Sequence, residues 1–194
     1  ILFYIYKMKN KILNSFNESK KLNSLVNKKL HKKILLAAEL IKNTISLNGN
    51  VIWCGNGGSA AQAEHFACEL IGRYQKNRRP IKSISLSSNT SSLTCISNDF
   101  GYQNIFSRQL EGMADQNDLL VVFSTSGNSK NILKVINQAK KMNLKVISFL
   151  GKNGGLAKNK STIDLIIPSN STARFQEYHL LIGHILCELV DDTF

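Results

Sequence analysis

Proline and long apolar runs are nearly absent from this sequence, and each absence excludes a class of protein. Two prolines and twelve glycines among 194 residues exclude a proline-rich linker and a collagen-like repeat. No run approaches the ~20 consecutive apolar residues that a membrane-spanning helix needs. Hydrophobic residues still make up 43% of the chain. The composition therefore predicts a single domain over residues 1–194, large enough to bury a core.

The sequence also lacks paired cysteines and a signal peptide. Its four cysteines stand far apart, without a C-x-x-C pair and with apolar neighbours, so we interpret them as buried free thiols in a reducing compartment. The opening apolar run, residues 1–6, is too short for a signal peptide and has no basic residue before it. We expect residues 1–8 to be an upstream extension that ends at a natural start, Met8, and the protein to be cytoplasmic. The cysteines are Cys54, Cys68, Cys95 and Cys187.

Acidic residues are scarce: 13 of them face 25 lysines and arginines, which gives a net charge of +12. Ten lysines and only two acids lie in residues 1–49, so +8 of the excess belongs to that segment and +4 to the rest. A basic excess raises the possibility of a nucleic-acid partner. However, the chain has no basic motif interleaved with aromatics, no zinc-finger spacing and no helix-turn-helix signature. We therefore favour a solvated basic face, and expect neither a nucleic-acid nor a membrane partner.

Hydrophobic periodicity predicts an α/β fold. Residues 9–48 carry apolar stripes typical of two helices, and short, wholly apolar strands then alternate with helical stretches through residues 49–194. This alternation predicts a doubly wound, five-stranded parallel sheet covered on both faces, with two additional N-terminal helices. In such sheets ligands bind beyond the carboxyl ends of the strands, here at the loops after Cys54 and Phe123. The expected strands are residues 51–54, 81–86, 119–123, 144–150 and 163–167.

The loop after Phe123 reads STSGNS, residues 124–129, between a buried strand and a helix. Its four hydroxyls and its backbone N–H groups meet at the positive end of the helix dipole, which favours phosphate. The loop has no lysine, so it is not a Walker loop, and a phosphomonoester fits better than a nucleoside triphosphate. The plainer alternative is a serine-rich turn in which Ser129 caps the helix.

The loop after Cys54 reads GNGGS, residues 55–59. Alone it is a weak signal, because a tight strand-to-helix turn needs glycine anyway, and the loop lacks the dinucleotide pattern G-x-G-x-x-G with a later acid. Beside the serine-rich loop it would form a second wall of one site. The Asn56 side chain could then donate to and accept from sugar hydroxyls.

Two helices carry candidate metal ligands or acid–base groups. His65, Glu69 and Arg73 follow one another at intervals of four, so they share one helix face. A histidine and a glutamate one turn apart can share a metal or act as an acid–base pair. The alternative is an exposed Glu69–Arg73 ion pair beside an incidental histidine. In the last helix His184 lies among apolar residues, as a core histidine would, with Gln176 eight positions earlier.

These motifs, in this order, resemble the phosphoheptose isomerases of the sugar isomerase (SIS) superfamily over about residues 12–194. The resemblance implies a flavodoxin-like α/β sandwich, a homotetramer with active sites at subunit interfaces, and one zinc ion per subunit. It also implies conversion of sedoheptulose 7-phosphate to D-glycero-D-manno-heptose 7-phosphate through an enediol, the first step of nucleotide-activated heptose biosynthesis. The matching blocks are CGNGGSAAQAEHFACELIGRY (54–74), SNDFGYQNIFSRQLE (97–111), STSGNS (124–129) and TARFQEYHLLIGHILCELVD (172–191).

Carried over position by position, the resemblance implies a role for each matching residue. Glu69 and His184 match the catalytic acid–base pair. One departure is Ala173, where some members have an acid before the arginine of the last helix. The implied metal ligands are His65, Glu69, Gln176 and His184. The implied substrate contacts are Asn56, Gly57, Gly58, Arg73, Asn98, Asp99, Ser124, Thr125, Ser126, Ser129 and Gln176.

Two other functions compete with the isomerase. One is a non-catalytic SIS protein that binds the replication initiator as a tetramer. The other is a different sugar-phosphate isomerase, such as one acting on six-carbon ketose phosphates, or a sugar-phosphate sensor. The regulators lack the complete metal and acid–base set. Here His65, Glu69 and His184 are all present together with STSGNS, so the sequence favours the enzyme.

Overall fold

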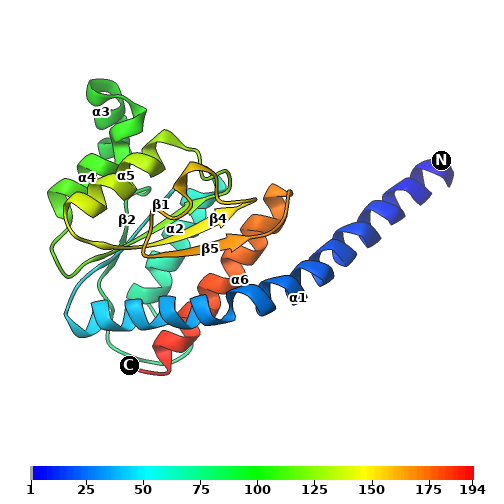
Figure 1. The fold of residues 1–194 in the computed structure, drawn as a ribbon, viewed down its shortest axis with the longest axis horizontal. Coiled ribbons are helices and arrows are strands. Elements are labelled where there is room, and N and C mark those ends of the chain that lie inside the picture. Colours follow the sequence, from blue (N-terminus) through cyan, green and yellow to red (C-terminus); the bar gives the residue numbers. More distant parts are fainter. Residues whose placement is uncertain (1) are drawn as a thin grey trace.

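The computed structural model describes residues 2–194 and contains the expected five-stranded parallel sheet, in the order β2-β1-β3-β4-β5 (Figure 1). The strands are β1 (Val51–Gly55), β2 (Ser83–Ser85), β3 (Leu119–Ser124), β4 (Lys145–Gly151) and β5 (Ile163–Ile167). The helices are α1 (Leu2–Ser46), α2 (Gly58–Ile71), α3 (Thr90–Phe100), α4 (Ile105–Met113), α5 (Lys130–Lys141) and α6 (Thr172–Asp191), with 3-10 turns at Tyr102–Asn104 and Gly155–Ala157.

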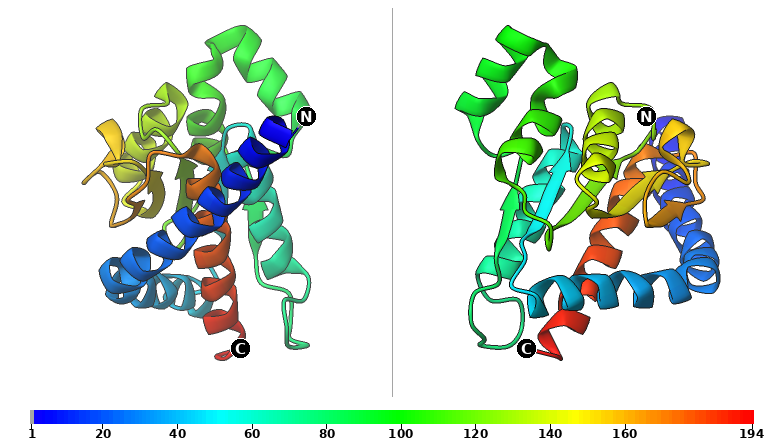
Figure 2. Two further views of the ribbon diagram at one scale, coloured as in Figure 1. Left: turned by 90° about the vertical axis from the view of Figure 1, so that its right-hand side faces the viewer. Right: turned by 60° about the vertical axis from the view of Figure 1, so that its left-hand side comes forward.

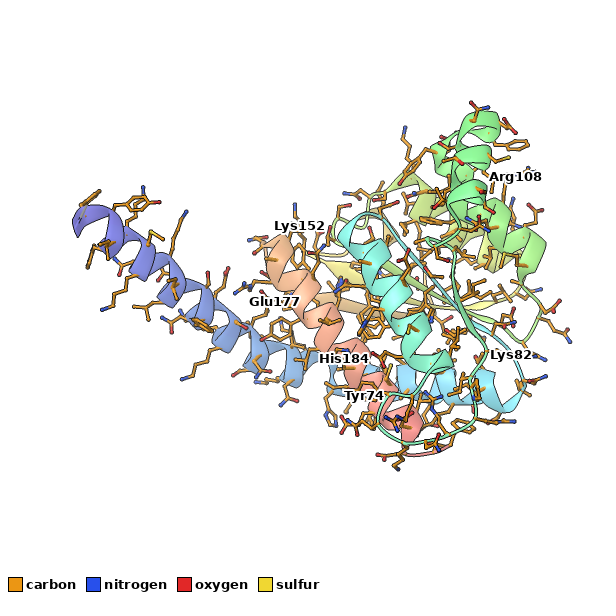
Figure 3. The ribbon with its side chains drawn as sticks, turned by 180° about the vertical axis from the view of Figure 1, so that it is seen from behind. Tyr74, Lys82, Arg108, Lys152, Glu177 and His184 are labelled. Carbon is orange, nitrogen blue, oxygen red and sulfur yellow. The ribbon has the colours of Figure 1, made fainter. Side chains whose placement is uncertain are left out.

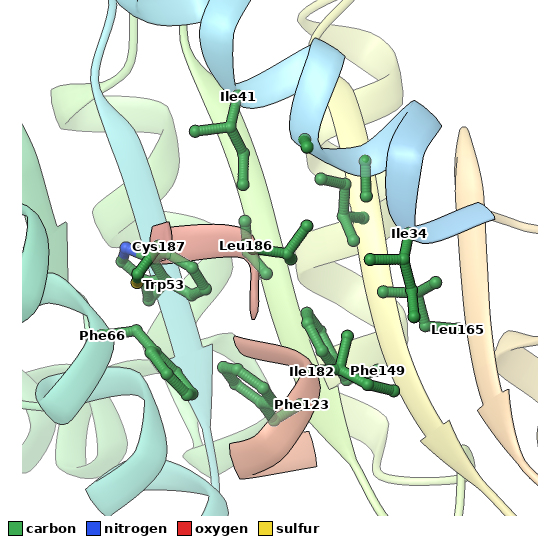
Figure 4. Packing of buried hydrophobic residues seen from close by; sticks show 14 of the residues in the cluster. Ile34, Ile41, Trp53, Phe66, Phe123, Phe149, Leu165, Ile182, Leu186 and Cys187 are labelled. Atoms are coloured by element: carbon green, nitrogen blue, oxygen red, sulfur yellow. The ribbon is translucent and has the colours of Figure 1, made fainter. Parts of the chain in front are cut away.

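Both faces of the sheet are buried, as its continuous apolar strands require. Every residue of β3 is buried, and successive residues alternate between two hydrophobic clusters. Phe123 and Trp53 belong to the cluster under α1, α2 and α6, which Figure 4 shows from close by. Leu120 and Val122 belong to the cluster under α4 and α5. The doubly wound architecture predicted from the sequence is confirmed.

The strand order places the two predicted loops side by side. β1 lies between β2 and β3, and in the parallel register Gly55 pairs with Phe123. The glycine-rich loop that follows β1 and the serine-rich loop that follows β3 therefore leave the same edge of the sheet from adjacent strands. This edge is the switch in strand order where open α/β sheets bind ligands.

The prediction of two N-terminal helices is wrong, because a single helix, α1, runs from Leu2 to Ser46. No glycine or proline occurs before Gly49, so nothing in the chain forces a break. The helix does change direction partway along (Figure 2). Its C-terminal part packs on the sheet through residues such as Ala37 and Ile41, whereas its N-terminal part projects from the body of the protein. Ile1 of the expected upstream extension lies outside the described residues.

The expectation of four buried cysteines is half correct. All four are free, but only Cys54 and Cys187 are buried, whereas Cys68 and Cys95 are exposed. Burial, followed by the charge of Glu69, raises the pKa of the Cys187 thiol to about 12. Cys68 is exposed because it lies on the outer face of α2, opposite the buried Phe66 and Leu70. Among residues 2–194, none of the helices combines the length and the apolar character needed to cross a membrane.

Candidate active site

Helices α2 and α6 lie side by side and bring three polar side chains together. The Nε2 atoms of His65 and His184 are 2.9 Å apart, and His65 Nε2 is 3.5 Å from Glu69 Oε1. One ligand atom from each of the three residues fits within a span of 4.8 Å. The sequence spacing thus correctly grouped His65 with Glu69, and the long-range partner His184 joins them.

A glycine allows the two helices to approach this closely. Gly183 precedes His184 and faces Phe66, the neighbour of His65, and a Cβ at position 183 would lie 2.1 Å from Cζ of that ring. Phe66 in turn stacks on Phe123 at a centroid distance of 5.9 Å and leans on Trp53 at 5.6 Å. These aromatic contacts therefore hold the backbone of α2 and α6 in place where the three polar side chains meet.

The environment of His184 shifts its titration. Burial, and next the neighbouring His65, lower the pKa of His184, while the Glu69 carboxylate opposes that shift. Two imidazole nitrogens and a carboxylate oxygen are donors that zinc accepts. A tetrahedral zinc ion with bonds of about 2.0–2.1 Å holds its ligand atoms roughly 3.3 Å apart. The separations of 2.9 and 3.5 Å lie on either side of that value, and all three ligand atoms lie within 4.8 Å of one another. The residues therefore fit a divalent metal after small side-chain adjustments.

Gln176, the fourth expected ligand, contacts the first half of α2. Its amide lies against Gly58 at the start of α2, where an added Cβ would collide with it. Its backbone carbonyl accepts a hydrogen bond from Gln62 Nε2 at 2.6 Å. It stands eight residues before His184 on α6, about 12 Å along the helix axis. The structure therefore holds Gln176 near the glycine-rich loop.

Asn56, in that loop, is held by two side chains. Asn56 Nδ2 donates to Asn131 Oδ1 at 2.9 Å, and Asn131 Nδ2 donates back to Asn56 Oδ1 at 2.8 Å. The hydroxyl of Tyr102 also donates to Asn56 Oδ1, at 2.9 Å. Sequence reasoning missed Asn131, whose only signal is a polar side chain on the apolar face of α5, two positions after STSGNS.

The serine-rich loop is held in shape by hydrogen bonds between its own residues. Ser124 is buried, and its Oγ accepts a hydrogen bond from the N–H of Gly127 at 3.1 Å. Ser126 Oγ accepts one from the N–H of Asn128, also at 3.1 Å. Ser129 occupies the position before α5, but its side chain makes no capping hydrogen bond. The first N–H groups of α5 are therefore not capped by Ser129, and Ser124 shapes the loop.

Three expected sugar contacts have exposed side chains. Asn98 and Asp99 are exposed at the end of α3, which projects from the body (Figure 1). Asn98 Nδ2 donates to Asp99 Oδ1 at 2.8 Å. Arg73 is exposed in the segment after α2, and the ion-pair neighbour of Glu69 is His65. Arg73, Asn98 and Asp99 are thus all exposed in the described chain.

The fold and this site define the class of protein. The model of the SIS domain family matches residues 15–151, which is well over half of the chain. The protein therefore belongs to the SIS domain family. Its open five-stranded parallel sheet agrees with that assignment.

Comparison with individual proteins narrows the class. The chain is 46% identical over 160 residues to a phosphoheptose isomerase of Nitratiruptor sp., covering 82% of this chain and 83% of the relative. It is 47% identical over 159 residues to that of Campylobacter concisus, covering 82% and 84%. The solved phosphoheptose isomerase of Francisella tularensis superposes with a TM-score of 0.92 at 32% identity, covering 96% of this chain and 99% of that one. The solved phosphoheptose isomerase of Neisseria gonorrhoeae superposes with a TM-score of 0.88 at 34% identity, covering 96% of this chain and 100% of that one.

Within the SIS family, the chain belongs to the phosphoheptose isomerases. It is an aldose–ketose isomerase, and the prediction of an enzyme in preference to a non-catalytic regulator is confirmed.

Proposed function

We propose that the chain converts sedoheptulose 7-phosphate to D-glycero-D-manno-heptose 7-phosphate with the residues described above. The observation that carries this proposal is the cluster of His65, Glu69 and His184. His65 and Glu69 stand on α2, the helix that begins at the glycine-rich loop, and His184 stands on α6. The glycine-rich and serine-rich loops leave the same edge of the sheet from adjacent strands. A sugar phosphate carries its phosphate at one end and its reacting carbons at the other. In this proposal the serine-rich loop binds the phosphate, and the three clustered residues act on the carbons.

The reaction needs one group for a carbon-bound proton and another for an oxygen-bound proton. In our proposal the Glu69 carboxylate removes a proton from C1 of the ketose while His184 supplies one to the oxygen on C2, which gives an enediol. A proton then leaves the oxygen on C1 and one is delivered to C2, which gives the aldose. Imidazole suits proton transfers between oxygens near pH 7.

The phosphate end is assigned to the serine-rich loop. Thr125, Ser126 and Ser129 are half-buried beside the N-terminus of α5, which Ser129 does not cap. Backbone N–H groups and the helix dipole at such a terminus attract an anion. Ser124 acts by holding Gly127 in place. Binding at this far end positions the reacting carbons at the histidines. Asn56, fixed by Asn131, is assigned to a sugar hydroxyl, with Gly57 and Gly58 beside it.

We propose one zinc ion per subunit, held by His65, Glu69 and His184, with Gln176 as the fourth ligand. The donor set of the three residues supports this assignment, and Gln176 would have to turn away from Gly58 to join them. A bound zinc ion would stabilise the negative charge that develops on the enediol oxygens. Glu69 would ligate through one oxygen and keep the other for the proton.

We also propose a homotetramer whose neighbouring subunits complete the site. The support is the exposure of Arg73, Asn98 and Asp99, together with the apolar side chains on the projecting part of α1. These apolar side chains suit a subunit interface. We place the enzyme in the cytoplasm, a reducing compartment that fits the exposed free thiols of Cys68 and Cys95.

Incubation of zinc-loaded protein with sedoheptulose 7-phosphate, followed by proton NMR, tests the function. An aldose anomeric signal is expected to appear, and elemental analysis should find about one zinc ion per chain. His65→Ala should lose most of the metal, whereas His31→Ala, on the exposed face of α1, should keep it. Binding of the sugar without any conversion would favour a sensor or regulator instead.

A further inference from the structure

A buried ion pair that the reaction does not use joins the ends of α2 and α6. Arg78 Nε donates to Asp191 Oδ1 at 2.6 Å, and the two side chains are 1% and 2% exposed. The remaining nitrogens of the guanidinium bind carbonyls in the last turn of α2. Nη1 donates to Leu70 O at 2.9 Å and Nη2 to Glu69 O at 3.0 Å. Arg78 therefore ties Glu69, a residue of the proposed site, to the end of α6.

Asp191 also holds the segment that follows α2. Its second oxygen, Oδ2, accepts hydrogen bonds from the backbone N–H groups of Gln75 at 2.8 Å and Lys76 at 3.0 Å. The preceding residue, Tyr74, stacks its ring on the imidazole of His184 at a centroid distance of 5.7 Å and an interplanar angle of 20° (Figure 3). The carboxylate thus anchors the backbone that presses Tyr74 onto His184.

The location of the pair suits control of the distance between the two helices. Asp191 follows His184 by seven residues, so it lies two turns further along the same face of α6. A planar guanidinium reaches three acceptors at once in a fixed fork, which an ammonium cannot do. A buried ion pair is weak evidence for stability in itself, because desolvation offsets much of its attraction. The Arg78–Asp191 pair is therefore expected to act on the relative placement of α2 and α6 more than on the free energy of unfolding.

We propose that Arg78 and Asp191 are positioning residues, which clamp the last turns of α2 and α6 and so set the placement of Glu69 and Tyr74 relative to His184. The inference rests on the proposed function, since it concerns the precision of the same site. It assigns neither residue a contact with the sugar.

Arg78→Lys tests the clamp while keeping the charge that Asp191 needs. It is expected to weaken zinc binding at least tenfold in competition with a chelator. It should also lower kcat at least tenfold. KM for sedoheptulose 7-phosphate should change less than threefold, because the serine-rich loop assigned to the phosphate connects β3 to α5 and is not part of α2 or α6. Circular dichroism establishes that the variant is folded at the assay temperature. Asp191→Asn, which keeps the shape of the side chain, is expected to act in the same direction.

Two controls separate positioning from loss of stability. Lys76→Ala removes an ion pair with Asp192 at 2.8 Å, which joins the same two segments with both side chains more than half exposed, and it should leave zinc affinity and kcat unchanged. Val135→Ala opens a cavity in the cluster on the opposite face of the sheet. It should lower the unfolding temperature while zinc affinity and kcat stay within twofold of wild type. Equal losses in Val135→Ala and Arg78→Lys would overturn the inference.

A measurement on the metal-free protein keeps the clamp testable apart from the zinc site. The ring current of Tyr74 should shift the NMR signals of the His184 imidazole protons, which are assigned through His184→Gln. Tyr74→Leu removes this shift, and Arg78→Lys is expected to remove at least half of it. An unchanged shift in folded Arg78→Lys overturns the clamp. Failure of the wild type to bind zinc overturns the proposed metal site instead, and the imidazole signals then decide the clamp alone.

Discussion

At the scale of single residues, the proposed chemistry depends on the surroundings of the His184 imidazole and of the Glu69 carboxylate. Burial lowers the pKa of His184, the residue proposed to transfer protons to and from the sugar oxygens. Glu69, with 22% of its side chain exposed, sits one turn from His65 on the same face. The carboxylate is therefore the group in this cluster suited to remove a proton from carbon.

Glu69→Gln should lower turnover at least 10²-fold, the low end of general-base contributions. The amide keeps the shape of the side chain and an oxygen able to ligate a metal, but it cannot accept the carbon-bound proton. Zinc content and KM should change little. Steady-state kinetics with sedoheptulose 7-phosphate measures turnover and KM, and elemental analysis measures the zinc content.

Glu64→Gln is the matched control, because Glu64 lies on the same helix and is exposed. It should behave as wild type. Near-full activity of Glu69→Gln would show that another residue is the base. Solvent deuterium that enters C1 or C2 of the sugar during wild-type turnover would support proton abstraction independently.

At the scale of elements, the packing of α2 on α6 decides whether the three polar residues meet. The contact at Gly183 admits the ring of Phe66, which Trp53 and Phe123 prevent from moving aside. His184 follows Gly183 directly, so any increase in the separation of the helices moves its imidazole away from His65. The same contact thus serves both the core and the site.

Gly183→Ala should lower the free energy of unfolding by about 1–3 kcal/mol, the usual cost of overpacking. This loss is expected even though alanine is favoured over glycine inside a helix by roughly 1 kcal/mol. Gly112→Ala on α4 provides the opposite case, because a Cβ there meets nothing within 4 Å, and it should stabilise the protein. Urea unfolding measures both variants, and a stabilised Gly183→Ala would contradict this account of the packing.

Much of the fold is predictable at this scale because the strands are short apolar runs with β-branched residues. Leu119–Phe123 could be recognised as a buried strand, and the strand-switch rule correctly placed the two candidate loops at one edge of the sheet. The continuity of α1 was missed because two apolar stripes were read as two helices, although no glycine or proline separates them. The outward position of Cys68 could have been found from the helical period of its neighbours.

The site was predictable only in part, for physical reasons. His65 and Glu69 are one turn apart on a single helix, so their spacing alone groups them. The Arg78–Asp191 pair joins residues 113 positions apart, and no local pattern in the sequence reports such a pairing. The position of the Gln176 amide depends on a side-chain rotamer, which spacing along a helix does not fix.

At the scale of the whole molecule, two groups of exposed residues point beyond one chain. The part of α1 that projects from the body carries exposed Phe3, Ile5 and Phe16, and the expected sugar contacts of α3 also face outward. Both features agree with the proposed assembly of several subunits. The basic excess of residues 1–49 lies along α1, largely on exposed positions, as a solvated face would.

Global stability should also depend on one histidine far from the chemistry. His179 is fully buried between the rings of Phe123 and Phe149, and neither ring nitrogen has a hydrogen-bond partner. Burial lowers the pKa of His179 to about 4, an effect that the nearby carbonyl of Leu150 offsets only in part. In the unfolded chain the group regains a pKa near 6.5.

The unfolded state therefore binds the proton first as the pH falls, so stability is present above pH 6.5 and is lost progressively towards pH 4. Between pH 7 and pH 5 this group alone should lower the free energy of unfolding by about 2 kcal/mol. His179→Leu should remove that part of the pH dependence, as measured by urea unfolding at the two pH values. His31→Leu, on the exposed face of α1, should keep the wild-type dependence. If His179→Leu and wild type lose equal stability between pH 7 and pH 5, His179 is not the group that titrates.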